Sequence, residues 1–306
     1  STVANTRYVV DRWTVFRGSY ATGSLCNQGI DIGTSDLPFT DAGIKTYARF
    51  GRASGNTSTS VVFLYYAFES QDSYRFAGKT ITLSFYYRNG SNFTSTAIAQ
   101  VYSSTGTDEA TQRGITATGI NTFIYNNITT TTSWTRYSFT GTVPTNATQL
   151  SVNVNYTPSG TAGANEYIDV TGIQLELGNI ATPFEVLPYP IEMQLCYRYY
   201  YQTVSGQYMS TGIIGTCYSN GGTGNTTSAV SCSVPILVTM RATPSSFGII
   251  GGATIYTGTG SSTLTSVAAS VENNQISPGL YAYTNSTLTL GNWYKLLGGI
   301  YVSAEL

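Results

Sequence analysis

VTGIQLELGNIATPFEVLPYPIEMQLCYRYYYQ (residues 170–202) is the stretch that decides the fold. Apolar and polar residues alternate up to Leu177, which is typical of a β-strand with one buried face. Gly172 interrupts this alternation and indicates a β-bulge. Gly178 and Asn179 end the strand, and the three prolines that follow predict an extended, non-helical chain.

The aromatic end of this stretch, residues 191–201, is too rich in apolar side chains for a solvated linker. Either its own domains or a neighbouring subunit has to cover it. In an alternating strand one side would carry Tyr197, Tyr199 and Tyr201, and the other side Arg198 and Tyr200. Around a threefold axis such a strand would build a stacked aromatic cluster. We therefore predict these five residues as a trimer interface, with ligand binding as the less favoured role.

Two motifs in this region carry a resemblance to a known family. IQLELGNIATPFE (173–185), followed by LCYRYYYQ (195–202), resembles a segment of bacteriophage tail-fibre and other virion surface proteins. In that family the pattern is roughly QLE-x-G-x-x-ATPFE, a short proline-containing spacer and LCxRYY. YVVDRW (8–13), GKTITLSFYYR (78–88) and MRATP (240–244) agree with it. The resemblance spans most of the chain. It implies a phage virion protein, usually trimeric, with a jelly roll like that of carbohydrate-binding modules and a C-terminal β domain.

The composition excludes several partners. Charged residues make up 9% of the 306 residues and the net charge is −1, against about 25% charged residues in an ordinary soluble protein. No basic surface is therefore expected for nucleic acid or an anionic membrane. No window approaches the ~18 consecutive apolar residues of a membrane span, so we expect a soluble chain that does not insert into membranes.

The pattern after the first 50 residues is that of an all-β protein. SVVFLYYAFE (60–69) is rich in β-branched and aromatic residues. In the strand at residues 81–88, Ile81, Leu83, Phe85 and Tyr87 point one way. Further strands are predicted at 97–102, 122–128, 134–140 and 150–156, and no helix longer than a turn or two.

The spacing of these strands predicts an antiparallel two-sheet sandwich. By the resemblance it is a jelly roll, followed by a second, smaller β domain. We place the jelly roll at 1–187, an aromatic linker or strand at 188–202 and the C-terminal β domain at 203–306.

The sequence contains few of the residues that common catalytic mechanisms need. The sequence has no histidine, which excludes Ser-His-Asp and Cys-His nucleophile systems. A glycoside hydrolase needs only two carboxylates, and Asp11, Asp108 and Glu109 are conceivable members. Adjacent acids in a Thr/Gly-rich segment are more often a solvated loop, so we expect no enzyme.

The metal and redox signals are also weak. In jelly rolls of the carbohydrate-binding-module type, the family resemblance implies a structural calcium near the closing strand, where Glu166 and Asp169 lie. Ordinary strand-end acids are the favoured reading, so no cofactor is expected, although structural calcium stays open. The cysteines are read as buried thiols, with a disulfide between Cys217 and Cys232 as the alternative.

Twenty-five tyrosines are the remaining resource for binding. Aromatic rings stack on sugars, and amide, guanidinium and hydroxyl groups hydrogen-bond to sugar hydroxyls. Tyr86 and Arg88 are on the polar side of their strand, and Tyr125 and Asn127 are on another. These four are the candidate glycan-binding residues. The alternative is that such tyrosines pack in a trimer interface or under loops.

Together these observations predict a non-enzymatic protein of the extracellular virion surface. Its expected partners are two further copies in a homotrimer, other virion proteins and host cell-surface polysaccharide. The family's usual N-terminal attachment segment is not seen before YVVDRW, which weakens the tail-fibre assignment and favours capsid decoration or a short spike, with the location left open between tail and capsid. A purely structural decoration protein and, less favoured, a polysaccharide depolymerase are the alternatives.

Overall fold

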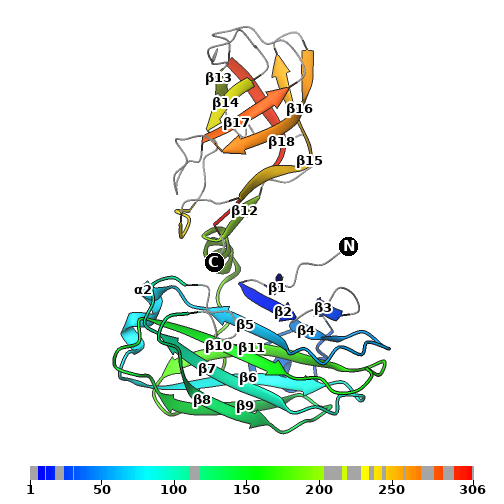
Figure 1. Ribbon diagram of the computed structural model, residues 1–306, viewed down its shortest axis with the longest axis vertical. Helices are drawn as coiled ribbons and strands as arrows, with labels where there is room; N and C mark the ends of the chain where they lie inside the picture. Colours follow the sequence, from blue (N-terminus) through cyan, green and yellow to red (C-terminus); the bar gives the residue numbers. More distant parts are fainter. Residues whose placement is uncertain are drawn as a thin grey trace. The chain divides into compact units, whose positions relative to one another are not determined.

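The computed structural model divides into two compact units, residues 1–186 and 187–305, which are described separately (Figure 1). Beyond residue 201, side chains are described only at 238–242, 303 and 304. The structure describes residues 6–10, 12–17, 24–29, 31–109, 117–202, 216–218, 229–233, 238–242, 246–257, 260–269, 279–284 and 293–304.

The first unit is an antiparallel β-sandwich of two sheets, which confirms the predicted jelly-roll class. The six-stranded sheet has the order β1 (Thr6–Val10), β2 (Trp13–Arg17), β5 (Val62–Ala67), β10 (Gln149–Tyr156), β7 (Ala97–Ser104) and β8 (Asn121–Ile128). The five-stranded sheet has the order β3 (Ser24–Gly29), β4 (Tyr47–Arg52), β11 (Tyr167–Leu177), β6 (Thr80–Asn89) and β9 (Thr135–Thr142).

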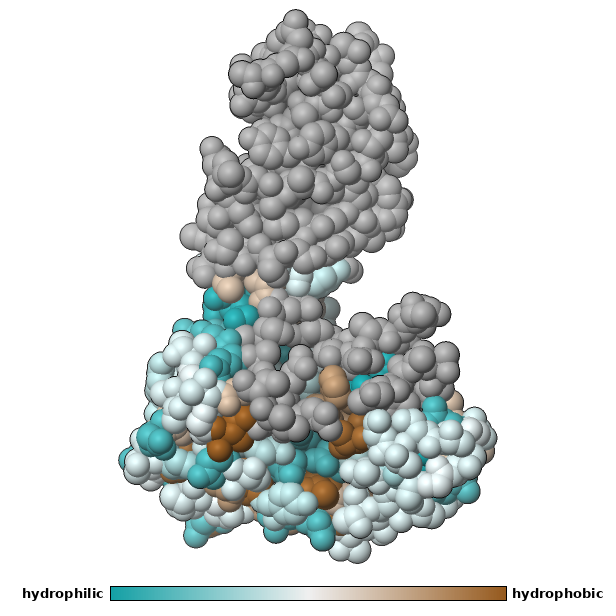
Figure 2. All heavy atoms as spheres, in the orientation of Figure 1, coloured by the Kyte–Doolittle hydropathy of each residue, from teal (hydrophilic) through white to brown (hydrophobic). Residues whose placement is uncertain are grey.

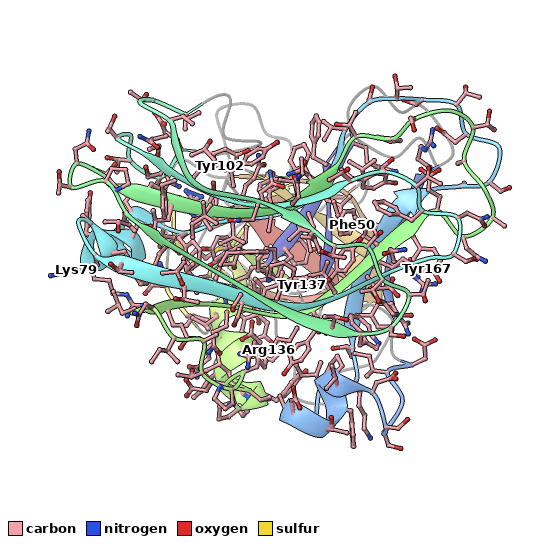
Figure 3. The ribbon with its side chains drawn as sticks, turned by 90° about the horizontal axis from the view of Figure 1, so that it is seen from below. Phe50, Lys79, Tyr102, Arg136, Tyr137 and Tyr167 are labelled. Carbon is pink, nitrogen blue, oxygen red and sulfur yellow. The ribbon has the colours of Figure 1, made fainter. Side chains whose placement is uncertain are left out.

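The core lies between the two sheets and follows the alternation of the strands. On β6, Ile81, Leu83 and Phe85 are all 0% exposed and belong to one hydrophobic cluster, as predicted. Phe50 of β4 belongs to the same cluster. Figure 3 shows Tyr102 and Arg136 on opposite outer sides of the sandwich.

Strand β11 contains the bulge predicted at Gly172. The register of β11 against β6 shifts between Thr171 and Gln174, and Gly172 has φ +58°. A Cβ atom at this position would lie 2.9 Å from the Tyr86 ring. Glycine is therefore required here both for its backbone conformation and for space.

The second unit is the predicted second, smaller β domain. Its strands are β12 (Tyr200–Gln202), β13 (Thr216–Tyr218), β14 (Ala229–Ser233), β15 (Ser246–Thr257), β16 (Gly260–Ala269), β17 (Gly279–Thr284) and β18 (Trp293–Ser303). They pair in the order β12-β18-β13-β14-β17-β16-β15, and β15 also pairs with β18. The strands from β18 to β15 thus form a closed ring, and β12 is added to it at β18.

The helices correct one prediction. Three are short: α1 (Leu37–Ala42), α2 (Ser70–Ser73) and the 3₁₀ turn η1 (Tyr74–Phe76). The fourth, α3 (Tyr189–Tyr197), has nine residues and was predicted as extended chain. Its proline lies in the first turn, where no backbone N–H is needed, and Glu, Met, Gln and Leu are good helix formers. Among the described residues, no helix is long and apolar enough to cross a bilayer.

Candidate functional site

The four residues predicted to bind a glycan lie on two different sheets. Tyr86 and Arg88 are on β6 of the five-stranded sheet, whereas Tyr125 and Asn127 are on β8, an edge strand of the six-stranded sheet. The structure therefore does not bring the four together, and each pair has its own surroundings.

Tyr86 is 0% exposed, although it leaves the core side of its strand. It packs with Tyr47, Trp134 and Phe184 in a second small hydrophobic cluster. Its hydroxyl donates to the Asp41 carboxylate at 3.0 Å, and burial together with this bond raises the pKa of Tyr86 to about 12. The ring is not available to stack on a sugar, which corrects the prediction. Alternation shows which residues leave the core, but not which of them other segments then cover.

Arg88 belongs to an ion-pair network on the same outer face. The fully buried Asp169 carboxylate accepts from Arg49 Nε at 2.7 Å, from Arg49 Nη2 at 2.8 Å and from Arg88 Nε at 2.8 Å. The Arg49 guanidinium lies 3.7 Å from the Tyr167 ring centroid, and the Arg88 guanidinium 4.6 Å from that of Trp134. This combination of charge-assisted bonds and cation–π contacts holds both arginines in place. Arg88 thus serves the packing of this face.

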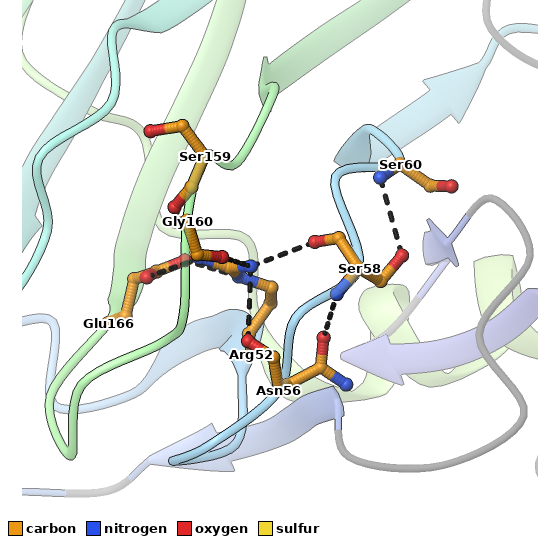
Figure 4. A network of polar contacts seen from close by, with 7 residues as sticks. All are labelled: Arg52, Asn56, Ser58, Ser60, Ser159, Gly160 and Glu166. Carbon is orange, nitrogen blue, oxygen red and sulfur yellow. Dashed lines mark hydrogen bonds and ion pairs between the residues drawn. The ribbon is translucent and has the colours of Figure 1, made fainter.

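The second acid of this region, Glu166, is paired with Arg52 (Figure 4). Arg52 is 0% exposed, and its Nε and Nη2 donate to the two Glu166 oxygens at 2.6 and 2.7 Å. The guanidinium also donates, at 2.8–3.2 Å, to the backbone carbonyls of Asn56, Ser58, Ser159 and Gly160. One side chain therefore ties two loops to the end of β11.

These pairings do not fit a calcium ion at Glu166 and Asp169. Carboxylate and carbonyl oxygens are the ligands that Ca²⁺ takes, but here arginine N–H groups occupy them. The described residues contain no group of three or more His, Cys, Asp or Glu able to hold a metal.

The motif at residues 174–185, which we call the clasp, folds back on itself. The Glu176 carboxylate accepts from the Thr182 hydroxyl at 2.7 Å and from Gln174 Nε2 at 2.7 Å. Gln174 Oε1 in turn accepts the backbone N–H of Glu185 at 2.9 Å. Phe184 then packs with the small cluster around Tyr86. The polar residues of the clasp thus have a structural role in this chain.

The outer side of the six-stranded sheet carries a different kind of surface. Tyr125 on β8 is opposite Gln100 on β7, which is opposite Asn153 on β10. Asn153 is opposite Tyr65 on β5, which is opposite Thr14 on β2. This first row therefore crosses five strands in register. All its members face away from the core, because their neighbours along each strand fill it.

A second row runs beside the first, two residues along each strand. It consists, in register, of Asn127, Ile98, Asn155, Phe63 and Phe16. We call the two rows together, with Tyr102 of β7, the amide–aromatic face.

Hydrogen bonds between side chains fix the middle of this face. Gln100 Oε1 accepts from the Tyr102 hydroxyl at 2.5 Å and from Asn155 Nδ2 at 2.8 Å. Asn155 Nδ2 also donates to Asn153 Oδ1 at 3.3 Å. Three amides and a tyrosine from two strands thus form one network, which sets the orientation of each amide.

The face is most accessible at its β8 end. Tyr125 is 59% exposed and Asn127 is exposed, whereas Gln100 is 9% and Asn155 7% exposed. Figure 2 shows hydrophilic and hydrophobic residues side by side over the first unit. Tyr125 therefore offers a ring beside preset amides, which is the combination that holds a sugar by stacking and hydrogen bonding.

Sequence reasoning found the β8 end of this face and missed its centre. Tyr125 and Asn127 were predicted, but Gln100, Asn153 and Asn155 were not. The signal was present in QLSVNVNY (149–156), where small polar and amide residues alternate with core residues on a central strand.

The acids considered for hydrolysis hold loops together. The Asp108 carboxylate accepts the backbone N–H of Ser70 at 2.8 Å. Glu109 accepts the N–H and the hydroxyl of Thr118 at 2.6 and 2.7 Å. Asp11 lies outside the described residues.

The residues predicted as a trimer interface contribute mainly to the second unit itself. They do not form one alternating strand, because Tyr197 ends α3 and β12 begins at Tyr200. The Tyr197 and Tyr201 rings meet edge to face at 5.4 Å, and Tyr199 is 6% exposed. Arg198 donates to a backbone carbonyl within the unit. Tyr200, 37% exposed, is the most open of the five.

No protein-family model and no curated protein matches the chain. Among solved structures, it is similar to the enzymatically active domain of tailspike protein 4 of bacteriophage CBA120, with 15% identity over 54% of this chain and a TM-score of 0.35. The chain spans 19% of the length of that protein. A family 4 carbohydrate-binding module matches with 16% identity over 55% of this chain and 88% of its own, at a TM-score of 0.35. The xylan-binding domain of a Paenibacillus barcinonensis protein matches with 10% identity, over 57% of this chain and 91% of its own, at a TM-score of 0.35.

Proposed function

We propose that this chain is a non-enzymatic protein of the bacteriophage virion surface that binds host-surface glycans through its amide–aromatic face. The observation that carries the proposal is the first row, where a well-exposed tyrosine adjoins amides already oriented by their own hydrogen bonds. Preset partners lose less conformational freedom when a ligand binds. The sequence resemblance to phage virion proteins supports the particle as its location.

A binding role is favoured over hydrolysis by the composition of this face. Its described side chains include no carboxylate, and glycoside hydrolysis uses a pair of them. We expect no release of reducing sugar from any polysaccharide that the protein binds.

The proposal includes a homotrimer, for which we propose a contact surface different from the predicted one. Within the first unit, large apolar side chains stay exposed at the end of β11 and after it: Leu177 at 56%, Ile180 at 74% and Val186 at 59%. Such a run is unfavourable in water unless something covers it. Light scattering that shows a stable monomer in dilute buffer would contradict the trimer without affecting the glycan proposal.

The test of function is an adsorption competition. Purified protein is mixed with host cells, and phage attachment is scored with wild type, with Tyr125→Ala and with Tyr74→Ala. Tyr74 is 53% exposed on η1, belongs to neither row of the face, and is the matched control. We expect wild type and the control to block attachment in a saturable way, and Tyr125→Ala to block at least ~5-fold less well, taking the stacking of a sugar as comparable to that of a nucleobase on an aromatic ring, about 1–3 kcal/mol.

Blocking should also disappear once the host polysaccharide is stripped. A folded oligomer that never blocks attachment would contradict the receptor role and favour a structural decoration protein, the second candidate. The exposed apolar stretch before α3 is the observation that favours this candidate.

A further inference from the structure

The two outer faces of the sandwich differ sharply in charge. On the five-stranded side, Arg49, Arg88 and Asp169 form the ion-pair network and Arg136 donates to Ser84. On the amide–aromatic face, the described side chains include no charged group. Among the described residues of that face, a ligand therefore meets amides, hydroxyls, aromatic rings and an isoleucine side chain.

The network also determines which polar atoms are left for a ligand. Gln100 Oε1 and Asn153 Oδ1 already accept protein hydrogen bonds, and Asn155 Nδ2 donates both of its bonds within the network. Among the described residues, nothing pairs with Gln100 Nε2, Asn153 Nδ2 or Asn155 Oδ1. These two donors and one acceptor lie on three neighbouring side chains that are 3–9% exposed, beside the open Tyr125 ring.

Sugar hydroxyls match this set, because each of them both donates and accepts. A carboxylate can accept from the two amide donors but has no hydrogen to give to the Asn155 oxygen. It would also lose water next to described side chains that supply no counter-charge, and an uncompensated charge is costly to desolvate.

We propose that the amide–aromatic face binds a neutral glycan and discriminates against uronate-containing polymers. This inference rests on the proposed function and specifies its ligand class. Tyr125 is the open member of the first row, whereas Asn153 and Tyr65 are 3% and 8% exposed. We therefore expect the ligand to meet the face at its β8 end, with the Tyr125 ring stacked on one sugar unit.

The test is affinity electrophoresis of the full chain in gels containing a mixed-linkage β-glucan, a galactan or an α-mannan, and in gels containing polygalacturonate or hyaluronan. Wild type, Tyr125→Ala, Gln100→Ala and the control Tyr74→Ala are run side by side. We expect retardation by at least one neutral polymer, with an affinity reduced at least ~5-fold in Tyr125→Ala and unchanged in Tyr74→Ala. Since no ion pair is involved, the retardation of wild type by the neutral polymer should change less than twofold between low and physiological salt.

The outcomes separate the two claims. Retardation by the acidic polymers, abolished in Tyr125→Ala, would overturn the neutral-ligand inference and keep glycan binding by this face. Binding that neither face variant alters would overturn the assignment of the face. Because Tyr125 is exposed on an edge strand, its replacement should leave the melting temperature unchanged, which calorimetry verifies.

Discussion

Arg52→Met is the substitution whose effect the structure determines most closely. It leaves the Glu166 side chain, 4% exposed, without its cation, and it removes the donor of four backbone carbonyls. Removing one partner of a buried ion pair costs about 3–5 kcal/mol. For a unit of this size, 1 kcal/mol corresponds to ~2–4 °C in melting temperature, so the expected loss is roughly 6–20 °C.

Differential scanning calorimetry measures this loss, with Arg75→Met as the control. Arg75 is exposed on η1, and exposed substitutions usually stay within about 0.5 kcal/mol. The double variant Arg52→Met/Glu166→Met should be more stable than Arg52→Met alone, because it also removes the stranded charge. A loss below ~2 °C for Arg52→Met, or a double variant less stable than the single one, would refute the reasoning.

Calcium provides a second test of the site that Arg52 occupies, formed by Glu166 and the four backbone carbonyls. In Arg52→Gly, the Glu166 carboxylate and the four carbonyls become oxygen ligands of the kind that Ca²⁺ takes. We expect added Ca²⁺ to raise the melting temperature of this variant and to leave wild type unchanged. A wild-type protein whose melting temperature falls when a chelator is added would contradict the conclusion that the Arg52 guanidinium, and not a calcium ion, pairs with Glu166.

Three further predictions concern the backbone, the clasp and the cysteines. Gly172→Ala should lower the free energy of unfolding by about 1–3 kcal/mol because of the positive φ, and further because the new Cβ atom crowds the Tyr86 ring. Gly160 has the same φ of +58° but lies in open space, so Gly160→Ala should show only the loss due to φ. Paired urea titrations of the two variants separate the two contributions. Although burial opposes it, hydrogen bonds hold the pKa of Glu176 below its ordinary 4.5, so its stabilisation is present above that pH and lost below it. Melting temperatures from pH 7 to 3 should therefore fall more for wild type than for Glu176→Gln, and parallel curves would contradict this. The register sets Cys217 opposite Cys232, with Cα atoms about 4.5–5.5 Å apart, which suits a disulfide; non-reducing peptide mapping should find the linked pair, and two free thiols would refute it.

The sandwich was predictable because its strands alternate cleanly. One buried face of β6 is predicted by the alternation of Ile81, Leu83 and Phe85, and the bulge is predicted by Gly172. Both features depend on local rules of strand geometry. Sequence alone does not reveal helix α3, because prolines usually break helices, although a proline in the first turn is tolerated.

The site was only half predictable for a different reason. Tyr86 and Tyr125 look alike in sequence, each on the outward side of a strand. One is covered by packing with Phe184 and Trp134, from distant parts of the chain, and the other stays exposed. Such long-range covering has no local signal. The amide network likewise depends on the register of β7 with β10, which alternation alone does not determine.

The most direct test of glycan binding by the amide–aromatic face is NMR mapping of side-chain amide signals during titration with a neutral oligosaccharide. The account predicts that the NH₂ signals of Gln100, Asn153 and Asn155 shift together, with the same saturation curve as the Tyr125 ring, while the Arg49 and Arg88 Nε–H signals stay in place. Shifts confined to the arginines or to the second unit, with those three amides unmoved, would contradict it.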